Sequence, residues 1–455
     1  MSTDQKAEKA LNEEAPPDPT EGIRRAIGRF VSKLEGIKTS EEIVMPLLTR
    51  HGKKVGEEFD SFSKENSIEK NEEGDQISYS LNLKSYARFE ELQKRRSATS
   101  SACFQTPRAL FVALVSTYDA YLGDLLRSLF YLKPELLNAS NRTFTFAELV
   151  NLADLQAARE YLIEKEVESV VRESHSKHFT WIENRFDLPL RKGLDSWPVF
   201  IEATERRNLF VHTDGKASAQ YLDVCASHGA DTGDIKSGQT LHIGPEYFER
   251  AYECIFEVGV KLGHVLWRKV APHTLEQADS ALNTICFDLL KSEKYRLAAN
   301  LLEFSLATLK KHHSNLSRRV FAVNLGIAYK MGDFGKSCKN HLDKEDWSDC
   351  GDHFKLANAV LTDDLVRAAA IMKSLGKDAN GIGRLGYETW PLFRQFRATE
   401  EFQSAYEEIY GEKFEIPENT VALEQDEDSE ELSEQEIGEE KQEDNKTVDS
   451  TRYRA

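Results

Sequence analysis

The sequence of 455 residues has little of what marks secreted, membrane-spanning or metal-binding proteins. Its six cysteines include no C-x-x-C pair, which argues against a zinc site and a disulfide framework and predicts reduced, mostly buried thiols. The longest apolar stretch, 109–132, is interrupted by Asp119, Asp124 and Arg127, whereas a membrane span needs about 20 apolar residues. The N-terminus is acidic and polar, unlike a secretory signal. We therefore expect a soluble, cytoplasmic protein.

Motifs of several large enzyme classes are also missing. The chain has no G-x-x-x-x-G-K-S/T phosphate loop, no H-E-x-x-H helix and no G-x-S-x-G turn. These absences argue against P-loop nucleotide hydrolysis, zincin-type proteolysis and α/β-hydrolase chemistry. No cofactor and no metal is implied.

Charge is unevenly distributed along the chain. The net charge is −18 at pH 7, but residues 424–449 alone contain 13 acidic and two basic residues. With hardly any aromatic residues, such a segment cannot bury enough apolar surface to fold. We expect a disordered acidic tail at 413–455 and a disordered, proline-containing tail at 1–22. The acidic total therefore says little about what the folded part binds.

Hydrophobic periodicity predicts an all-α protein. A helix is expected at 23–48, followed from residue 52 by a polar loop or poorly packed hairpin, so that 23–84 forms a helical extension and linker. The strongest helix signal comes next. Thr106 is a typical N-cap, Pro107 suits the first helical position, and apolar residues then repeat on one face.

An all-helical bundle is predicted over residues 85–272. Besides the helix that starts at Pro107, its expected helices lie at 146–171, 198–212 and 246–270. Residues 227–240 are rich in Gly, Ser and Asp and are expected to form a surface loop.

The C-terminal part changes to short paired helices. Patterns resembling the tetratricopeptide signature lie at 281–306, 324–334 and 356–372. Their spacing of about 35 to 39 residues suits such repeats, although one residue is missing between Tyr329 and Gly332. We expect a tetratricopeptide-like array at 273–412, with a last helix from Trp390 to Tyr410, that offers a surface to a peptide or protein partner. A generic helical bundle is the alternative. His312 and His313, in an expected turn, are predicted to be solvated.

The stretch E-R-R-N-L-F-V-H-T-D-G at 205–215 carries the pattern with the most chemical content. Arg207 and His212 enclose an apolar Leu-Phe-Val, Asn208 follows the arginine, and Thr-Asp-Gly ends the expected helix. This context distinguishes the pair from two others in which four to six residues also separate an arginine from a following histidine. Those pairs are Arg172/His178 and Arg268/His273.

Side chains of these types suit the cleavage of RNA through its own 2′-hydroxyl. That reaction needs a group that accepts a proton near neutral pH, as histidine does, and a cation that stabilises charge on the phosphate, as arginine does. Asn208 lies four residues before His212, on the same helical face, and can orient the imidazole or the phosphate. Arg207 and His212 lie about 140° apart around an ideal helix, so a distorted helix end or a second subunit is needed to join them.

The Arg-Asn-…-His stretch resembles the signature of the HEPN superfamily, in which a histidine follows an arginine after four to six residues. The resemblance covers roughly residues 85–271 and implies a HEPN-like antiparallel helical bundle. It implies these roles: Arg207 and His212 catalytic, Asn208 supporting, and Arg206 and Lys216 in contact with the RNA backbone. It also implies a homodimer and a metal-independent endoribonuclease, toxin-like, in bacterial defence or stress. The helical repeats would then be a sensor or regulatory surface, and a basic rim is expected around Arg207.

Two alternatives stand beside a nuclease. Arg207 can instead pair with Glu202, Glu205 or Asp214, and His212 can bond to a carbonyl at the end of its helix. The resemblance also allows an inactive domain, since many members of the HEPN superfamily have lost activity and bind proteins or nucleotides. A non-catalytic scaffold is therefore the second function class.

Overall fold

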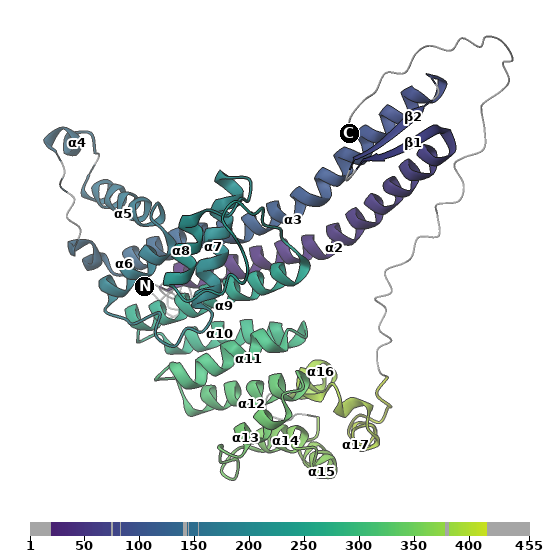
Figure 1. Cartoon of the computed structure of the whole chain (residues 1–455). Coiled ribbons are helices and arrows are strands. Elements are labelled where there is room, and N and C mark those ends of the chain that lie inside the picture. Colours follow the sequence, from purple (N-terminus) through teal and green to yellow (C-terminus); the bar gives the residue numbers. More distant parts are fainter. Residues whose placement is uncertain are drawn as a thin grey trace, which may run out of the picture. The chain divides into compact units, whose positions relative to one another are not determined.

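The computed structural model describes residues 20–73, 76–81, 83–139, 143, 145–152, 154–377 and 382–415. The tails predicted to be disordered lie outside these residues, except for 20–22 and 413–415. The described chain is all-α apart from one two-stranded hairpin (Figure 1). The described residues divide into two compact units, one made of those within 20–46 and 104–396 and the other of those within 47–103 and 397–415. Helices α2 and α3 pass from one unit into the other.

Helix α2 (Glu21–Asn66) is longer than the predicted helix at 23–48. Residues 52–66 were expected to be a loop or hairpin and are helical, because their Lys and Glu residues favour helix and pair along it, as Lys53 does with Glu57. The predicted hairpin forms only beyond them, from the antiparallel strands β1 (Ser67–Glu73) and β2 (Gln76–Leu81).

Helix α3 (Leu83–Leu132) begins well before the predicted N-cap Thr106 and holds Pro107 in its interior. The prediction that a helix starts at Pro107 is therefore wrong. A proline inside a helix costs roughly 3 kcal/mol, and the apolar face that follows offsets this cost by burial. The predicted core positions on that face are fully buried: Phe111, Leu114, Tyr118, Leu122, Leu125 and Leu129.

Among the described residues, α3 is the one helix long and apolar enough to cross a membrane. Half of its most apolar window of 18 residues is buried inside the structure. The core helix of a soluble protein passes the same test of length and composition, so one such helix is weak evidence for a membrane span.

Helices α2, α3 and α9 (Pro245–Val270) meet at two glycines of α9. A Cβ atom at Gly259 would lie 2.2 Å from a ring carbon of Phe30, and one at Gly263 would lie 2.3 Å from the hydroxyl oxygen of Tyr121. Tyr121 donates a hydrogen bond to the Gly259 carbonyl at 3.0 Å, and its ring stacks on that of Phe30. Only a residue without a side chain fits at either position.

Five further helices and one 3-10 turn complete the bundle between α3 and α9. They are η1 (Pro134–Ala139), α4 (Phe146–Val150), α5 (Leu155–Val171), α6 (His175–Phe186), α7 (Trp197–His212) and α8 (Ala219–Ser227). The helices predicted at 198–212 and 246–270 are confirmed to within one residue. The helix predicted at 146–171 is interrupted, because Asp154 caps α5 by accepting a hydrogen bond from the Ala157 N–H at 2.7 Å.

Three helix pairs follow α9, as the sequence predicts. They are α10 (Leu275–Lys291) with α11 (Tyr295–Glu303), α12 (Asn315–Met331) with α13 (Gly335–Leu342), and α14 (Asp352–Leu361) with α15 (Leu365–Leu375). A π-helical turn, η2 (Phe304–Thr308), follows α11, and α10, α11 and α12 lie side by side (Figure 1). Their membership of the tetratricopeptide class stays a prediction.

The last helix begins later than predicted. After α16 (Gly383–Thr389), Trp390 precedes the 3-10 turns η3 (Pro391–Phe393) and η4 (Phe396–Ala398), and α17 (Glu400–Tyr410) starts only after its N-cap Thr399. Its predicted end is confirmed, because Gly411 takes a positive φ of 77° there.

The six cysteines are free thiols, and five of them are buried, as predicted. Burial raises the pKa of the Cys225 thiol to about 12, so this group stays protonated and unreactive at neutral pH.

Candidate functional site

Helix α7 presents the predicted site residues on its last two turns. Glu205, Asn208 and His212 follow the i, i+3, i+7 spacing that puts side chains on one helical face. The helix stops directly after His212, where Asp214 and Gly215 take positive φ angles of 50° and 78°. The predicted Asp-Gly stop is confirmed.

A buried arginine of α3 holds the turn that ends α7. Arg108 is 4% exposed and donates from Nη1 to the Asp214 carboxylate at 3.0 Å and from Nη2 to the Leu241 carbonyl at 2.9 Å. Its guanidinium also lies over the ring of Phe210, 4.9 Å from the centroid. These contacts fix the backbone that carries His212.

A pocket of about 560 Å³ lies beside this face. Its lining includes Arg207, Asn208 and His212 from α7, together with Asp119 from α3 and His175 from α6. The long arginine side chain reaches this pocket although it leaves the helix about 140° away from His212. The three residues expected to act together therefore meet in one pocket of a single chain.

Arg207 reaches across to α3. Its Nη2 donates to Oδ2 of Asp119 at 2.7 Å, and the two side chains are 19% and 21% exposed. Its Nε is buried with no hydrogen-bond partner in the described part of the chain. The three carboxylates that the sequence offered as partners are not paired with it, so the ion-pair alternative holds with a different partner.

Asp119 also bonds to a histidine. Nε2 of His175, which is 5% exposed, lies 2.8 Å from Oδ1 of Asp119. Burial alone would raise the pKa of Asp119, but the hydrogen bond from His175 and the charges of His175 and Arg207 outweigh burial and lower it. Asp119 is therefore an anion at neutral pH that binds two donors on separate oxygens.

His178, one turn further along α6, lies behind this group. It is 1% exposed, and burial lowers its pKa to about 4. Both of its ring nitrogens lack a hydrogen-bond partner among the described residues. His178 is therefore a neutral core residue and does not line the pocket.

His212 is exposed, and within the described ranges its ring has no hydrogen-bond or ion-pair partner. The alternative of a histidine bonded to a carbonyl is therefore wrong. Asn208, half-buried on the same face, likewise has no side-chain hydrogen bond to another described residue and lines the pocket. Lys216 is exposed but stands outside the pocket lining, and its contact with RNA stays a prediction.

Arg206 cannot contact RNA, and this prediction is wrong. The residue is 8% exposed, its Nε donates to Glu202 at 2.6 Å, and its guanidinium lies 4.1 Å from the centroid of the Tyr247 ring. Glu202 also accepts hydrogen bonds from the hydroxyls of Tyr221 and Tyr247, each at 2.6 Å. A buried charge needs partners inside the protein, and this network supplies them.

The pocket lining carries both signs of charge. Arg172 and Arg207 stand beside Asp119, Glu173 and Glu205. The expected basic rim is therefore not found in the lining. A phosphate bound here would be recognised by Arg207 and local hydrogen-bond donors rather than by a broad positive field.

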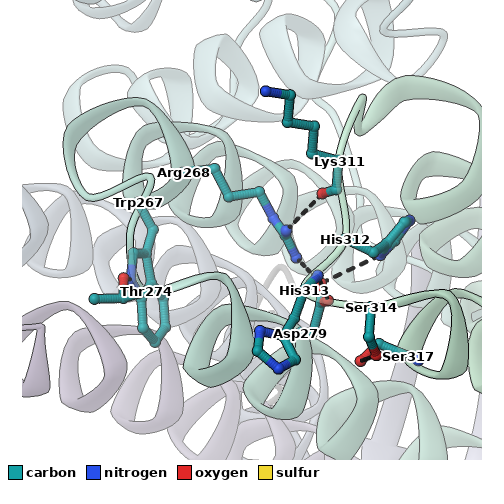
Figure 2. A network of polar contacts seen from close by, with 9 residues as sticks. All are labelled: Trp267, Arg268, Thr274, Asp279, Lys311, His312, His313, Ser314 and Ser317. Carbon is teal, nitrogen blue, oxygen red and sulfur yellow. Dashed lines mark hydrogen bonds and ion pairs between the residues drawn. The ribbon is translucent and has the colours of Figure 1, made fainter.

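A second Arg-Asp-His cluster joins α9, α10 and the segment before α12 (Figure 2). Asp279 accepts from Nη2 of Arg268 at 2.6 Å and from the backbone N–H of His313 at 2.7 Å, and Nδ1 of His312 lies 3.2 Å away. The side chains of Arg268, Asp279 and His312 are 9%, 4% and 7% exposed. The prediction that His312 is solvated is wrong, whereas the His313 side chain is 48% exposed.

Neither of the two rival Arg/His pairs brings both residues to one pocket. In one pair, Arg172 lines the pocket but His178 is buried elsewhere in the core. In the other pair, Arg268 belongs to the closed cluster, and His273 is exposed.

Asp119 and His175 are the site residues that the sequence pattern misses. One signal was present for Asp119, since a carboxylate within the apolar stretch 109–132 requires a partner on another element. No local spacing signal points to His175, which is 56 residues away from Asp119.

The described residues hold no group of three or more His, Cys, Asp or Glu placed to bind a metal ion. No family model, no curated protein and no solved structure matches the chain. The likeness to the HEPN superfamily therefore stays a prediction based on the motif.

Proposed function

We propose that this chain is a metal-independent endoribonuclease of the HEPN type, with its site in the pocket at the end of α7. One observation carries the proposal: Arg207, Asn208 and His212, the residues of the Arg-Asn-…-His motif, line a single pocket. The pocket has room for a phosphodiester with its flanking sugars.

Arg207 is the phosphate-binding group in this proposal. The guanidinium has five N–H donors, and the contact with Asp119 engages Nη2. The same contact fixes the plane of the guanidinium, so that donors are positioned before substrate binds and stabilise charge that develops on the phosphate. Asp119 thus reduces the net positive charge available to the phosphate, but it orients the guanidinium of Arg207.

His212 accepts the proton of the 2′-hydroxyl. As the 2′-oxygen attacks phosphorus, the bond to the 5′-oxygen breaks and leaves a 2′,3′-cyclic phosphate and a 5′-hydroxyl. Asn208, one turn before His212 on the same face, orients the imidazole or the phosphate. Because the lining has no basic rim, we propose single-stranded RNA bound through few phosphates, with a shallow salt dependence.

The test is cleavage of RNA in the presence of EDTA. We expect His212→Ala to lower the rate by about 100-fold or more, the size expected for a lost general base, and to abolish growth arrest on overexpression. His273→Ala, an exposed histidine outside the pocket, is the matched control and should cleave like wild type. A wild-type chain that is inert in both assays would refute the proposal.

We also propose a homodimer, and whether its two protomers share each site has a separate test. If Arg207 and His212 act from different protomers, mixing Arg207→Ala with His212→Ala restores about a quarter of the wild-type activity, because half of randomly formed dimers each regain one site. If one chain supplies both, as the shared pocket suggests, mixing restores nothing.

The biological setting follows the resemblance. We propose a cytoplasmic, toxin-like role in bacterial defence or stress, with the helix pairs α10 to α15 as the sensor or regulatory surface for a protein or peptide.

A non-catalytic scaffold is the second candidate, favoured by the ion pair of Arg207 with Asp119 and by the carboxylates of Glu173 and Glu205 in the lining. It predicts that His212→Ala changes neither RNA cleavage nor growth.

A further inference from the structure

Cleavage through the 2′-hydroxyl moves two protons. One proton leaves the attacking 2′-oxygen, and another must reach the 5′-oxygen when its bond to phosphorus breaks. His212 cannot perform both transfers in a single event. The proposed reaction therefore calls for a second proton carrier in the same pocket.

We infer that His175 is a second catalytic imidazole, which protonates the leaving 5′-oxygen, and that Asp119 is the residue that positions it. This inference rests on the proposed function. It assigns to the ribonuclease site two residues from α6 and α3, far from the motif in sequence.

The first argument is the geometry of His175. It is the first residue of α6, it lines the pocket together with Arg207 and His212, and its Nε2 lies 2.8 Å from Oδ1 of Asp119. Since a carboxylate accepts, Nε2 carries a hydrogen, and Nδ1 is the ring atom left to exchange a proton with substrate.

The second argument is that the ring is held in place. It packs against Tyr118 and Phe200, with ring centroids 6.0 and 5.8 Å apart, and against His178 at 5.0 Å. Asp119 fixes one nitrogen of an imidazole that belongs to a pocket lining, and hydrolases hold a histidine in its working tautomer by the same kind of carboxylate contact.

The third argument is that Asp119 links both groups. One carboxylate oxygen bonds to Arg207 and the other to His175, at 2.7 and 2.8 Å. The phosphate-binding cation and the proton donor are thereby fixed relative to each other. In the closed cluster of Figure 2, by contrast, the second ring nitrogen of His312 is buried with no hydrogen-bond partner among the described residues, so the imidazole there can serve no substrate.

The step balances as follows. The bond from the 2′-oxygen to phosphorus forms while His212 takes the 2′-proton. The bond from phosphorus to the 5′-oxygen breaks while Nδ1 of His175 gives its proton to that oxygen. The products are a 2′,3′-cyclic phosphate and a free 5′-hydroxyl, and exchange with water returns each imidazole to its starting state.

The experiment compares two substrates that differ only in the leaving group. The dinucleotide UpA has an alkoxide leaving group that needs a proton, whereas uridine 3′-(4-nitrophenyl phosphate) releases a stable phenolate that does not. We expect His175→Gln, which keeps an N–H for Asp119, to slow UpA cleavage by about 100-fold but cleavage of the nitrophenyl ester by no more than about threefold.

Two variants bracket this result. His212→Ala should lose both activities, because the 2′-proton must be removed from either substrate. His273→Gln, exposed and outside the pocket, should keep both. An equal loss on both substrates for a folded His175→Gln, or no loss on either, would overturn the inference and leave the proposed function standing.

The wild-type pH profile keeps the inference testable should His175→Gln fail to fold. UpA cleavage should give a bell-shaped profile, and the fall on its alkaline side should vanish with the nitrophenyl ester, because no donor is then needed. Identical profiles would refute a leaving-group donor. A wild-type chain that cleaves neither substrate would instead refute the proposed function.

Discussion

The molecule contains the same polar arrangement twice, in two different settings. Asp119 binds an arginine Nη2 at 2.7 Å and a histidine nitrogen at 2.8 Å, and Asp279 does so at 2.6 and 3.2 Å. At the pocket the aspartate is 21% exposed, whereas at the junction of α9 and α10 it is 4% exposed. Each cluster also has a buried histidine beside it, His178 for the first and His264 for the second.

This comparison shows that residue types alone do not identify a site. The Asp279 cluster ties the end of α9 to α10 and to the segment before α12, and its charges contact only protein (Figure 2). The Asp119 cluster ties three helices together in the same way but leaves Arg207 and His175 on a pocket wall. Access for a ligand distinguishes the candidate site from a structural joint.

The largest difference is expected on removing each carboxylate. Asp279→Ala should lower the free energy of unfolding by about 3 to 5 kcal/mol, because it leaves a buried arginine without its partner. Asp119→Ala should cost only about 1 to 2 kcal/mol, because solvent in the pocket reaches Arg207. Urea unfolding measures both, with the exposed Asp288→Ala on α10 as control. Equal losses would make the Asp119 cluster as structural as the other.

The next effect concerns acid. Burial lowers the folded-state pKa of His178 to about 4 and that of His264 to about 3, from 6.5. Below pH 6.5 the unfolded chain therefore binds protons that the folded chain does not, so stability falls as the pH falls toward these values. Between pH 7 and pH 5 each histidine should account for roughly 2 kcal/mol of the loss.

The substitutions His178→Phe and His264→Phe should each reduce the loss of unfolding free energy between pH 7 and pH 5 by roughly 2 kcal/mol. Urea unfolding at both pH values measures it, and the exposed His273→Phe is the control. If neither substitution changes the pH dependence of stability, these imidazoles bind protons as readily in the folded chain as in the unfolded chain, which would contradict the prediction.

The smallest effect separates two asparagines. Asn208→Ala should slow RNA cleavage about five- to tenfold, the worth of about one hydrogen bond, with the unfolding free energy unchanged. Asn324 is 2% exposed and donates to Asn283 at 2.8 Å, so Asn324→Ala should affect stability and not cleavage. Its loss should cost about 1 kcal/mol of stability and leave cleavage intact. Loss of stability in both variants would assign Asn208 to the scaffold.

Local signals predicted the parts of the fold that depend on local chemistry. Helix α7 begins beside Pro198 and stops at Asp214 and Gly215, and α9 begins at Pro245, so the sequence marks their ends to within one residue. The same reasoning wrongly placed a helix start at Pro107. The apolar face after this proline packs into the core, and the helix continues on both sides of it.

In the candidate site, too, local spacing predicts some residues, whereas packing between distant segments decides the others. The motif places Asn208 and His212 on one face by spacing alone, but it cannot tell which of two adjacent arginines faces inward. Arg206 and Arg207 differ by about 100° around the helix, and only the packing of Glu202 and Tyr247 decides that Arg206 is buried. Asp119 reaches the site over 88 residues of chain, a distance at which periodicity carries no information.

The contact of Gly259 with Phe30 also makes two distant positions interdependent. A methyl group at Gly259 would meet the phenyl ring at 2.2 Å, so an alanine there is tolerated only alongside a smaller residue at position 30. Each change alone should lower the stability of the protein. Alanine at position 259 would collide with the Phe30 ring, and a smaller residue at position 30 would leave a cavity in the core. In a collection of natural variants, these two positions should change together or not at all.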